Sequence, residues 1–137
     1  MKKLFLISLL VIANFCTNAQ SLTINNNTSC IVYYAFRGYN VSVCSPASPT
    51  PISYQINPHS STTYASVSSV TWYGGGVPTG WLDFAASDNP SSFPVTNFVG
   101  ISTCLDPGSS YTYMNTCGVS VNYTWSTVSG NVTVTLK

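Results

Sequence analysis

The stretch that decides the fold class is VSVNYTWSTVSGNVTVTL, residues 119–136. Apolar side chains alternate with Ser, Asn and Thr from Val119 to Trp125, which is the period of a strand with one buried face. Ser129-Gly130-Asn131 marks a turn, and residues 132–136 repeat the alternation. The pattern predicts a β-hairpin at the end of the domain.

Working outward from this hairpin, the rest of the chain also has the character of strands. Residues 22–25 alternate in the same way, and residues 30–37 (CIVYYAFR) are apolar on both faces, which is typical of a central strand covered on each side. Further strands are expected at 52–56, 62–67, 70–73, 81–85, 95–103 and 111–114. Because no stretch has a helical period, we predict a single antiparallel β-sandwich of about eight or nine strands, Ig-like or jelly-roll-like.

The first nineteen residues have the layout of a secretory signal peptide. Lys2 and Lys3 are followed by an apolar run at 4–13 and by small residues before Gln20. The run is too short to span a bilayer, and no longer apolar run follows it. We therefore expect a signal peptide at 1–19 and a secreted domain at 20–137, extracellular or at the cell surface, with the periplasm as the alternative.

The charge pattern excludes one class of partner. The whole chain has a formal net charge of +1, but Lys2 and Lys3 would leave with the signal peptide. The remaining charges are then Arg37, Lys137 and three aspartates. Two cations cannot neutralise a row of phosphates, so nucleic acid is not an expected partner. Ser, Thr and Asn make up 45 of the 118 remaining residues, and the abundant aromatic and β-branched residues still favour a folded sheet over disorder.

The cysteines outside the signal peptide are Cys30, Cys44, Cys104 and Cys117. An even number in an exported chain predicts disulfides, and four cysteines allow three pairings. The short spacings favour Cys30–Cys44 and Cys104–Cys117. A metal site is the alternative, but it is not favoured because no C-x-x-C pair is present and the chain has one histidine.

Few residues are suited to catalysis. The single histidine, His59, lies in an Asn57-Pro58 turn, and the chain contains no glutamate. Sugar hydrolysis would need two of the three aspartates as a carboxylate pair. Asp106 and Asp88 are explained by turns, and Asp83 is expected to face solvent from an edge strand. We expect no enzyme activity and no cofactor.

The best candidate for a binding site is WYGGGVPTGW, residues 72–81. Three glycines allow close approach to a ligand, and they lie between Trp72, Tyr73 and Trp81, whose amphipathic rings suit stacking on sugars or protein contacts. If this loop binds a ligand, Trp81 must be substantially exposed. The alternative is a hairpin loop whose tryptophans point into the core.

The opening LTINNNTSCIVY, residues 22–33, carries a family resemblance, together with Asn18-Ala19-Gln20. An Asn-rich turn that leads through a cysteine into an aromatic strand resembles small secreted β-sandwich proteins of the Bacteroidota. The opening is also similar to thaumatin-like proteins, whose dense disulfides and acidic cleft are absent here. The resemblance implies a secreted sandwich and transfers no functional residue.

Two functional hypotheses follow. The first is a secreted or cell-surface binding module for an extracellular glycan or surface protein, acting through Trp72, Tyr73 and Trp81. The second is a structural component, such as a matrix, adhesin or filament subunit, whose near-neutral surface packs against copies of itself. Joint exposure of the three rings would favour the first, and an open edge at a terminal strand would favour the second.

Overall fold

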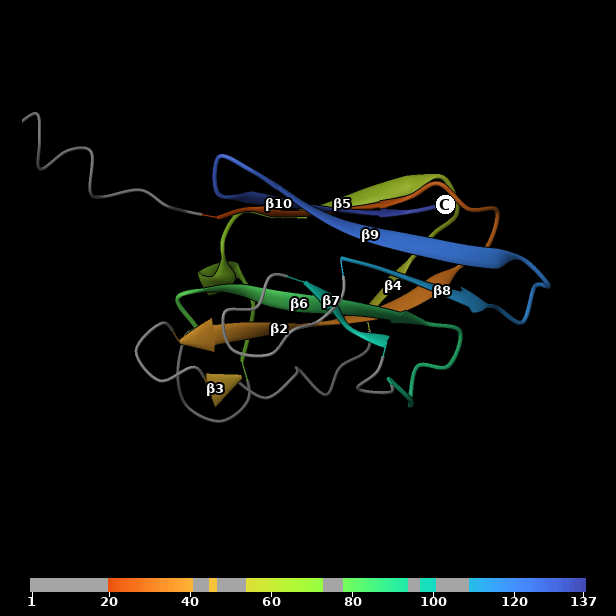
Figure 1. Cartoon of the computed structure of the whole chain (residues 1–137), viewed down its shortest axis with the longest axis horizontal. Coiled ribbons are helices and arrows are strands. Elements are labelled where there is room, and N and C mark those ends of the chain that lie inside the picture. Colours follow the sequence, from red (N-terminus) through yellow and green to blue (C-terminus); the bar gives the residue numbers. More distant parts are fainter. Residues whose placement is uncertain (1–19, 41–44, 47–53, 73–77, 94–96, 101–108) are drawn as a thin grey trace, which may run out of the picture.

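The computed structural model describes residues 20–40, 45–46, 54–72, 78–93, 97–100 and 109–137, which form two packed β-sheets (Figure 1). Sheet A has the order β5 (Ser60–Tyr64), β1 (Leu22–Asn26), β10 (Asn131–Leu136), β9 (Ser120–Val128) and β8 (Ser110–Met114). Sheet B has the order β3 (Ser45–Pro46), β2 (Val32–Asn40), β6 (Gly80–Ser87) and β7 (Val99–Gly100), and β4 (Tyr54–Ile56) also pairs with β2. The predicted β-sandwich is confirmed. The predicted signal peptide lies outside the described residues.

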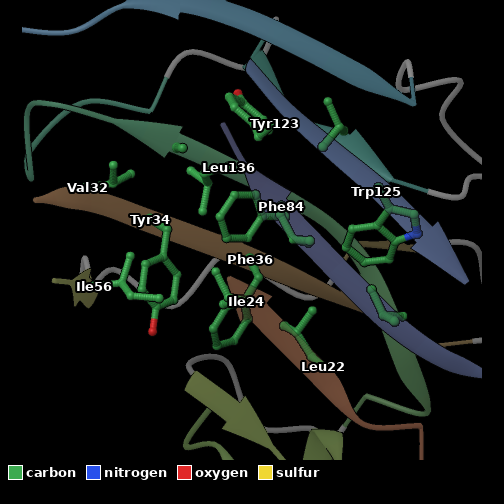
Figure 2. Close-up of a cluster of buried hydrophobic side chains, with 14 of the residues drawn as sticks. Leu22, Ile24, Val32, Tyr34, Phe36, Ile56, Phe84, Tyr123, Trp125 and Leu136 are labelled. Carbon is green, nitrogen blue, oxygen red and sulfur yellow. The ribbon is translucent and has the colours of Figure 1, made fainter. Parts of the chain in front are cut away.

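The C-terminal hairpin forms as its alternation predicts. β9 pairs antiparallel with β10, and Trp125 lies opposite Val134. Every second residue is buried between the sheets from Val121 to Trp125 and from Val132 to Leu136, whereas the last three residues of β9 are exposed. The two inner faces form one core (Figure 2). Period-two alternation therefore places these apolar side chains on the face that meets sheet B.

The sandwich is not wholly antiparallel, and the prediction was wrong in this respect. β1 and β10 pair in parallel, with Leu22 opposite Val132 and Asn26 opposite Leu136. Parallel neighbours need a crossover connection, and here nearly the whole chain lies between them. Both terminal strands are consequently interior strands of sheet A, whose edges are β5 and β8.

β2 is the central strand that its composition predicts. It pairs with β6 on one side and with β3 and β4 on the other. Tyr34 and Phe36 point into the core, while Ala35, which faces the opposite side of the sheet, is also buried. Burial of both faces at Tyr34, Ala35 and Phe36 explains the apolar run there, whereas Ile31, which precedes the strand, is 47% exposed.

Other elements differ from their predicted ranges: β6 and β8 are longer than predicted, and β5 ends at Tyr64. The described part of the chain contains ten strands, two of them only two residues long, and one 3-10 turn, η1 (Val67–Ser69). Residues 70–72 are not a strand, although a strand was predicted at 70–73. Among the described residues, no helix is long and apolar enough to cross a membrane.

A buried amide fastens the corner where the chain passes between the sheets. The Asn26 side chain donates to the carbonyls of Cys30 (2.8 Å), Asn57 (3.0 Å) and Ile56 (3.3 Å), and its Oδ1 accepts from the Thr28 hydroxyl at 2.7 Å. Asn26 therefore connects the β1–β2 turn to the β4–β5 turn. These hydrogen bonds compensate for the burial of a polar side chain.

Candidate functional site

Trp81 lies in the core, as the alternative of inward-pointing tryptophans expects, and it lacks the exposure that ligand binding through this ring would require. Only 3% of its surface is exposed, and its indole N–H donates to the Gln20 carbonyl at 2.6 Å. Its ring meets Phe36 edge-on, with 5.2 Å between centroids and 89° between planes. A ring enclosed in this way has no face available to a ligand. Trp81 therefore packs against its neighbours as a core residue.

Trp72 is half-buried and held in place by specific contacts. Its indole N–H donates to the Val67 carbonyl at 2.6 Å, at the start of η1. Its ring lies 6.0 Å from both Phe36 and Trp81. A Cβ at Gly38 would stand 2.9 Å from Trp72 Cη2, so glycine is needed there for the ring to approach β2. Tyr73, the third predicted ligand-binding residue, lies outside the described residues.

Two tyrosines extend this group at the side of the sandwich where β4 and β5 lie. The Tyr54 ring stacks on Phe36 at 5.4 Å and 8°, and the Tyr64 ring meets Phe36 edge-on at 5.1 Å. Both tyrosines are half-buried, and their centroids are 6.0 Å apart. We call the connected rings the aromatic cluster: Tyr34, Phe36, Tyr54, Tyr64, Trp72 and Trp81. Three of them, Tyr54, Tyr64 and Trp72, keep part of their surface in solvent.

Two hydroxyls of the aromatic cluster are paired. Tyr34 Oη and Tyr64 Oη lie 2.8 Å apart and share a hydrogen bond. Burial raises the pKa of both phenols above the ordinary value of 10.0. The partly exposed side chains of Tyr54, Tyr64 and Trp72 are uncharged, which suits contact through dispersion rather than proton transfer.

Tyr54 and Tyr64 were not predicted as site residues, because the predicted site was the continuous segment 72–81. Each lies in a predicted strand, but their meeting depends on β4 pairing with β2 in one sheet and β5 pairing with β1 in the other. The available signal is a tyrosine in each of the two predicted strands that precede Trp72 in the chain.

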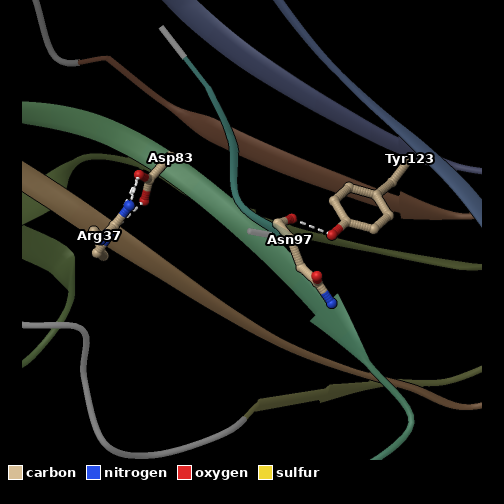
Figure 3. A network of polar contacts seen from close by, with 4 residues as sticks. All are labelled: Arg37, Asp83, Asn97 and Tyr123. Atoms are coloured by element: carbon tan, nitrogen blue, oxygen red, sulfur yellow. Dashed lines mark hydrogen bonds and ion pairs between the residues drawn. The ribbon is translucent and has the colours of Figure 1, made fainter. Parts of the chain in front are cut away.

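Asp83 forms a buried ion pair, and the expectation of a solvent-facing edge residue was wrong. β6 is flanked by β2 and β7, and Asp83 lies opposite Arg37 with no exposed surface. Arg37 Nε donates to both carboxylate oxygens, at 2.7 and 3.0 Å, and Nη2 donates to Oδ2 (Figure 3). The Arg37 guanidinium also lies 4.1 Å from the centroid of the Phe98 ring. Burial raises the pKa of Asp83, and Arg37 acts in the opposite direction.

This carboxylate is poorly suited to catalysis. Both Asp83 oxygens accept hydrogen bonds from one guanidinium, and the residue has no exposed surface. His59 is exposed in the β4–β5 turn at a φ of 50°. Among the described residues, no group of three His, Cys, Asp or Glu side chains could hold a metal ion. The Arg37–Asp83 pair joins β2 to β6 and has the character of a structural contact.

Two of the four predicted disulfide cysteines lie in the described chain. Cys30 is buried in the β1–β2 turn, and Cys117 is exposed in the turn between β8 and β9. Both are free thiols, and the interaction with Cys30 raises the pKa of Cys117. Cys44 and Cys104 lie outside the described residues.

Comparisons with known proteins yield no relative. No protein-family model, curated protein or solved structure matches the chain. The functional inference therefore depends on the fold and the aromatic cluster alone.

Proposed function

We propose that the protein is a secreted or cell-surface binding module without enzymatic activity, and that it recognises extracellular glycans. The observation that carries the proposal is the aromatic cluster, in which Tyr54, Tyr64 and Trp72 are half-exposed above the buried rings of Phe36 and Trp81. Tyr73, next to Trp72 in the chain, is proposed as a further contact.

The packing of these rings favours a preorganised binding surface. Tyr54 stacks on Phe36, and Trp72 is fixed by its hydrogen bond to Val67 and its close approach to Gly38. Rings held in this way lose little conformational entropy when a ligand binds. Sugars present flat patches of C–H groups, and an uncharged aromatic surface matches them better than it matches a charged partner.

Export is part of the same proposal. It rests on the basic, apolar and small-residue layout of residues 1–19 and on the even number of cysteines after them. A sandwich with Ig-like or jelly-roll-like connections, bridged by disulfides at Cys30, Cys44, Cys104 and Cys117, would be suited to an oxidising compartment.

Oligosaccharide binding by matched variants tests the glycan proposal. Purified protein should bind at least one member of a glycan array, and Trp72→Ala and Tyr54→Ala should each weaken that binding at least tenfold. Tyr111→Ala is the matched control, since Tyr111 is a half-buried tyrosine on β8 that packs against Tyr123. Equal loss of binding in all three variants, or no binding by the folded wild type, would refute the proposal.

A second candidate function is assembly into a matrix or filament. The terminal strands are not open edges, but the edges of sheet A, β5 (SSTTY) and β8 (SYTYM), contain no charged residue and no proline. Both pair with their inner neighbours without a register shift. Natural sheets commonly protect their edges with Lys, Pro or bulges, so unprotected edges favour pairing between copies.

Sedimentation tests the assembly candidate separately. Concentration-dependent oligomers should form in the wild type, and Ser61→Lys should suppress them by placing a charge on the β5 edge. Asn131→Lys is the matched control, because Asn131 is also an exposed polar residue but lies on the interior strand β10. A monomeric wild type at every concentration would exclude edge-to-edge assembly.

A further inference from the structure

The outer face of sheet A carries regular rows of small hydroxyl side chains. In each strand one set of alternate residues faces the core, so the residues between them lie on the outer face. The first row crosses four neighbouring strands and consists of residues that pair in register: Thr63, Thr23, Thr133 and Ser126. All four residues are half-exposed or exposed.

A second row lies beside the first, two residues along each strand. It crosses all five strands of sheet A and again follows the pairing register: Ser61, Asn25, Thr135, Thr124 and Ser110. Asn25 is the one member of the two rows without a hydroxyl. We call the residues of the two rows the hydroxyl face.

The sheet fixes the positions of these side chains. Neighbouring strands lie about 4.7–4.9 Å apart and alternate residues of one strand about 6.6 Å apart, so the two rows form part of a two-dimensional lattice with these repeats. Thr23 Oγ1 lies 3.1 Å from Thr63 Oγ1, and the Ser126 hydroxyl donates to the Thr133 carbonyl at 3.3 Å. Threonine is also β-branched, which restricts its χ1 angle. The hydroxyls therefore form a preorganised pattern.

The hydroxyl face is uncharged but rich in hydrogen-bonding groups. None of the five strands of sheet A contains a charged residue, and the nearest charge along the chain is Lys137, directly after β10. A hydroxyl both donates and accepts hydrogen bonds, as a water molecule does. The face therefore complements a partner that is itself uncharged and that offers donors and acceptors in a regular array.

We propose that the hydroxyl face binds ice. Its two repeats are close to the spacings between oxygen atoms on a prism plane of ice, so hydroxyls of both rows meet the lattice together. Binding removes no charged group from its hydration shell, which would oppose contact with a solid of neutral molecules. A glycan fits this face less well, because neither row contains an aromatic ring that could stack on a sugar.

The twist of the sheet decides which members of the hydroxyl face contribute most. Neighbouring strands rotate by roughly 20–25°, so the outer strands turn away from a plane that rests on β1 and β10. Thr23 and Thr133 lie on these two strands, next to each other in the first row. In Figure 1, β5, β10 and β9 lie above β2 and β6, so the hydroxyl face is directed away from sheet B. Substitutions at Thr23 and Thr133 should therefore affect ice binding most.

Ice growth in a salt buffer without sugar tests the proposal. The wild-type protein should enter a slowly growing ice crystal, from which albumin is excluded, and should slow the coarsening of ice grains. Thr23→Lys and Thr133→Lys should each abolish both effects by placing a long charged side chain at the centre of the face. Thr127→Lys is the matched control, because Thr127 is an exposed threonine of β9 that follows Ser126 and so lies on the opposite face of the strand.

The three variants should keep the wild-type melting curve in circular dichroism, since each changes a side chain that is half-exposed or exposed. Exclusion of the wild-type protein from ice would overturn the proposal whichever variants fold, and so would full ice activity in Thr133→Lys. Oligomers that form in the wild type and not in Thr133→Lys, without ice activity, would also overturn it and would assign the face to contacts between copies. No glycan is present and the aromatic cluster is unchanged, so the outcome is separate from that of the proposed function.

Discussion

Replacing Trp81 with alanine should destabilise the domain severely, because the structure makes this ring part of the core. Trp81 is 3% exposed, packs edge-on against Phe36 and donates a hydrogen bond to the Gln20 carbonyl. A buried tryptophan removes about 150–250 Å² from water, which is worth roughly 4–6 kcal/mol at 25 cal/mol per Å². Alanine retains part of this burial, so we expect a loss of about 4 kcal/mol in the free energy of unfolding, within the usual range for such truncations.

Urea unfolding followed by circular dichroism gives this number directly. A loss of about 4 kcal/mol should lower the melting temperature by roughly 15 °C in a domain of this size. Trp125→Ala is the comparison, since Trp125 is 7% exposed and its indole N–H has no partner among the described residues. Trp72→Ala, at a half-buried ring, should cost clearly less. If Trp81→Ala loses less than about 1 kcal/mol, Trp81 is not a core residue and the reasoning fails.

Three further perturbations probe the polar contacts. Asp83→Asn should cost about 3 kcal/mol by leaving Arg37 unpaired, and Arg37→Met with Asp83→Leu should recover most of it; an unchanged urea midpoint in Asp83→Asn would contradict this. Asn26→Ala should cost about 2–4 kcal/mol through the loss of buried hydrogen bonds to three carbonyls, whereas Asn25→Ala, at a half-exposed neighbour, should be near neutral. Burial raises the pKa of four tyrosines: Tyr34, Tyr64, Tyr113 and Tyr123. The folded state therefore keeps phenol protons that the unfolded chain releases near pH 10. The free energy of unfolding should consequently fall as the pH rises above 10. Tyr34→Phe should make the fall of the unfolding free energy with pH less steep. A slope equal to that of the wild type would contradict this prediction.

The parts of the fold that sequence predicts are those encoded by neighbouring residues. Alternation from Val119 to Trp125 fixes both the strand and its buried face, and the apolar run before Arg37 indicates a central strand. The parallel pairing of β1 with β10 leaves no such mark, because it joins residues more than a hundred positions apart. Which strands pair depends on how the whole core assembles. Local periodicity in the sequence does not predict it.

The candidate site shows the same division. Asp83 was expected at an edge because a lone aspartate in a strand usually faces water, and its partner Arg37 is 46 positions away. Trp81 next to a glycine-rich loop has the composition of an exposed ring, but pairing of β6 with β2 turns it toward Phe36. Trp72 is partly exposed. The tyrosines that complete the aromatic cluster, Tyr54 and Tyr64, come from two different sheets.

The most direct test of the glycan-binding proposal is the response of the three indole N–H signals to added oligosaccharide in two-dimensional NMR. The chain has three tryptophans, of which Trp72 belongs to the half-exposed rim of the aromatic cluster, Trp81 lies beneath it, and Trp125 lies on β9 outside the cluster. The protein is titrated with hexasaccharides of glucose, mannose, xylose and N-acetylglucosamine. We predict that at least one sugar shifts the Trp72 signal in a saturable way, with a smaller shift for Trp81 and none for Trp125. A saturable shift confined to Trp125, or no shift with any of the four sugars, would contradict it.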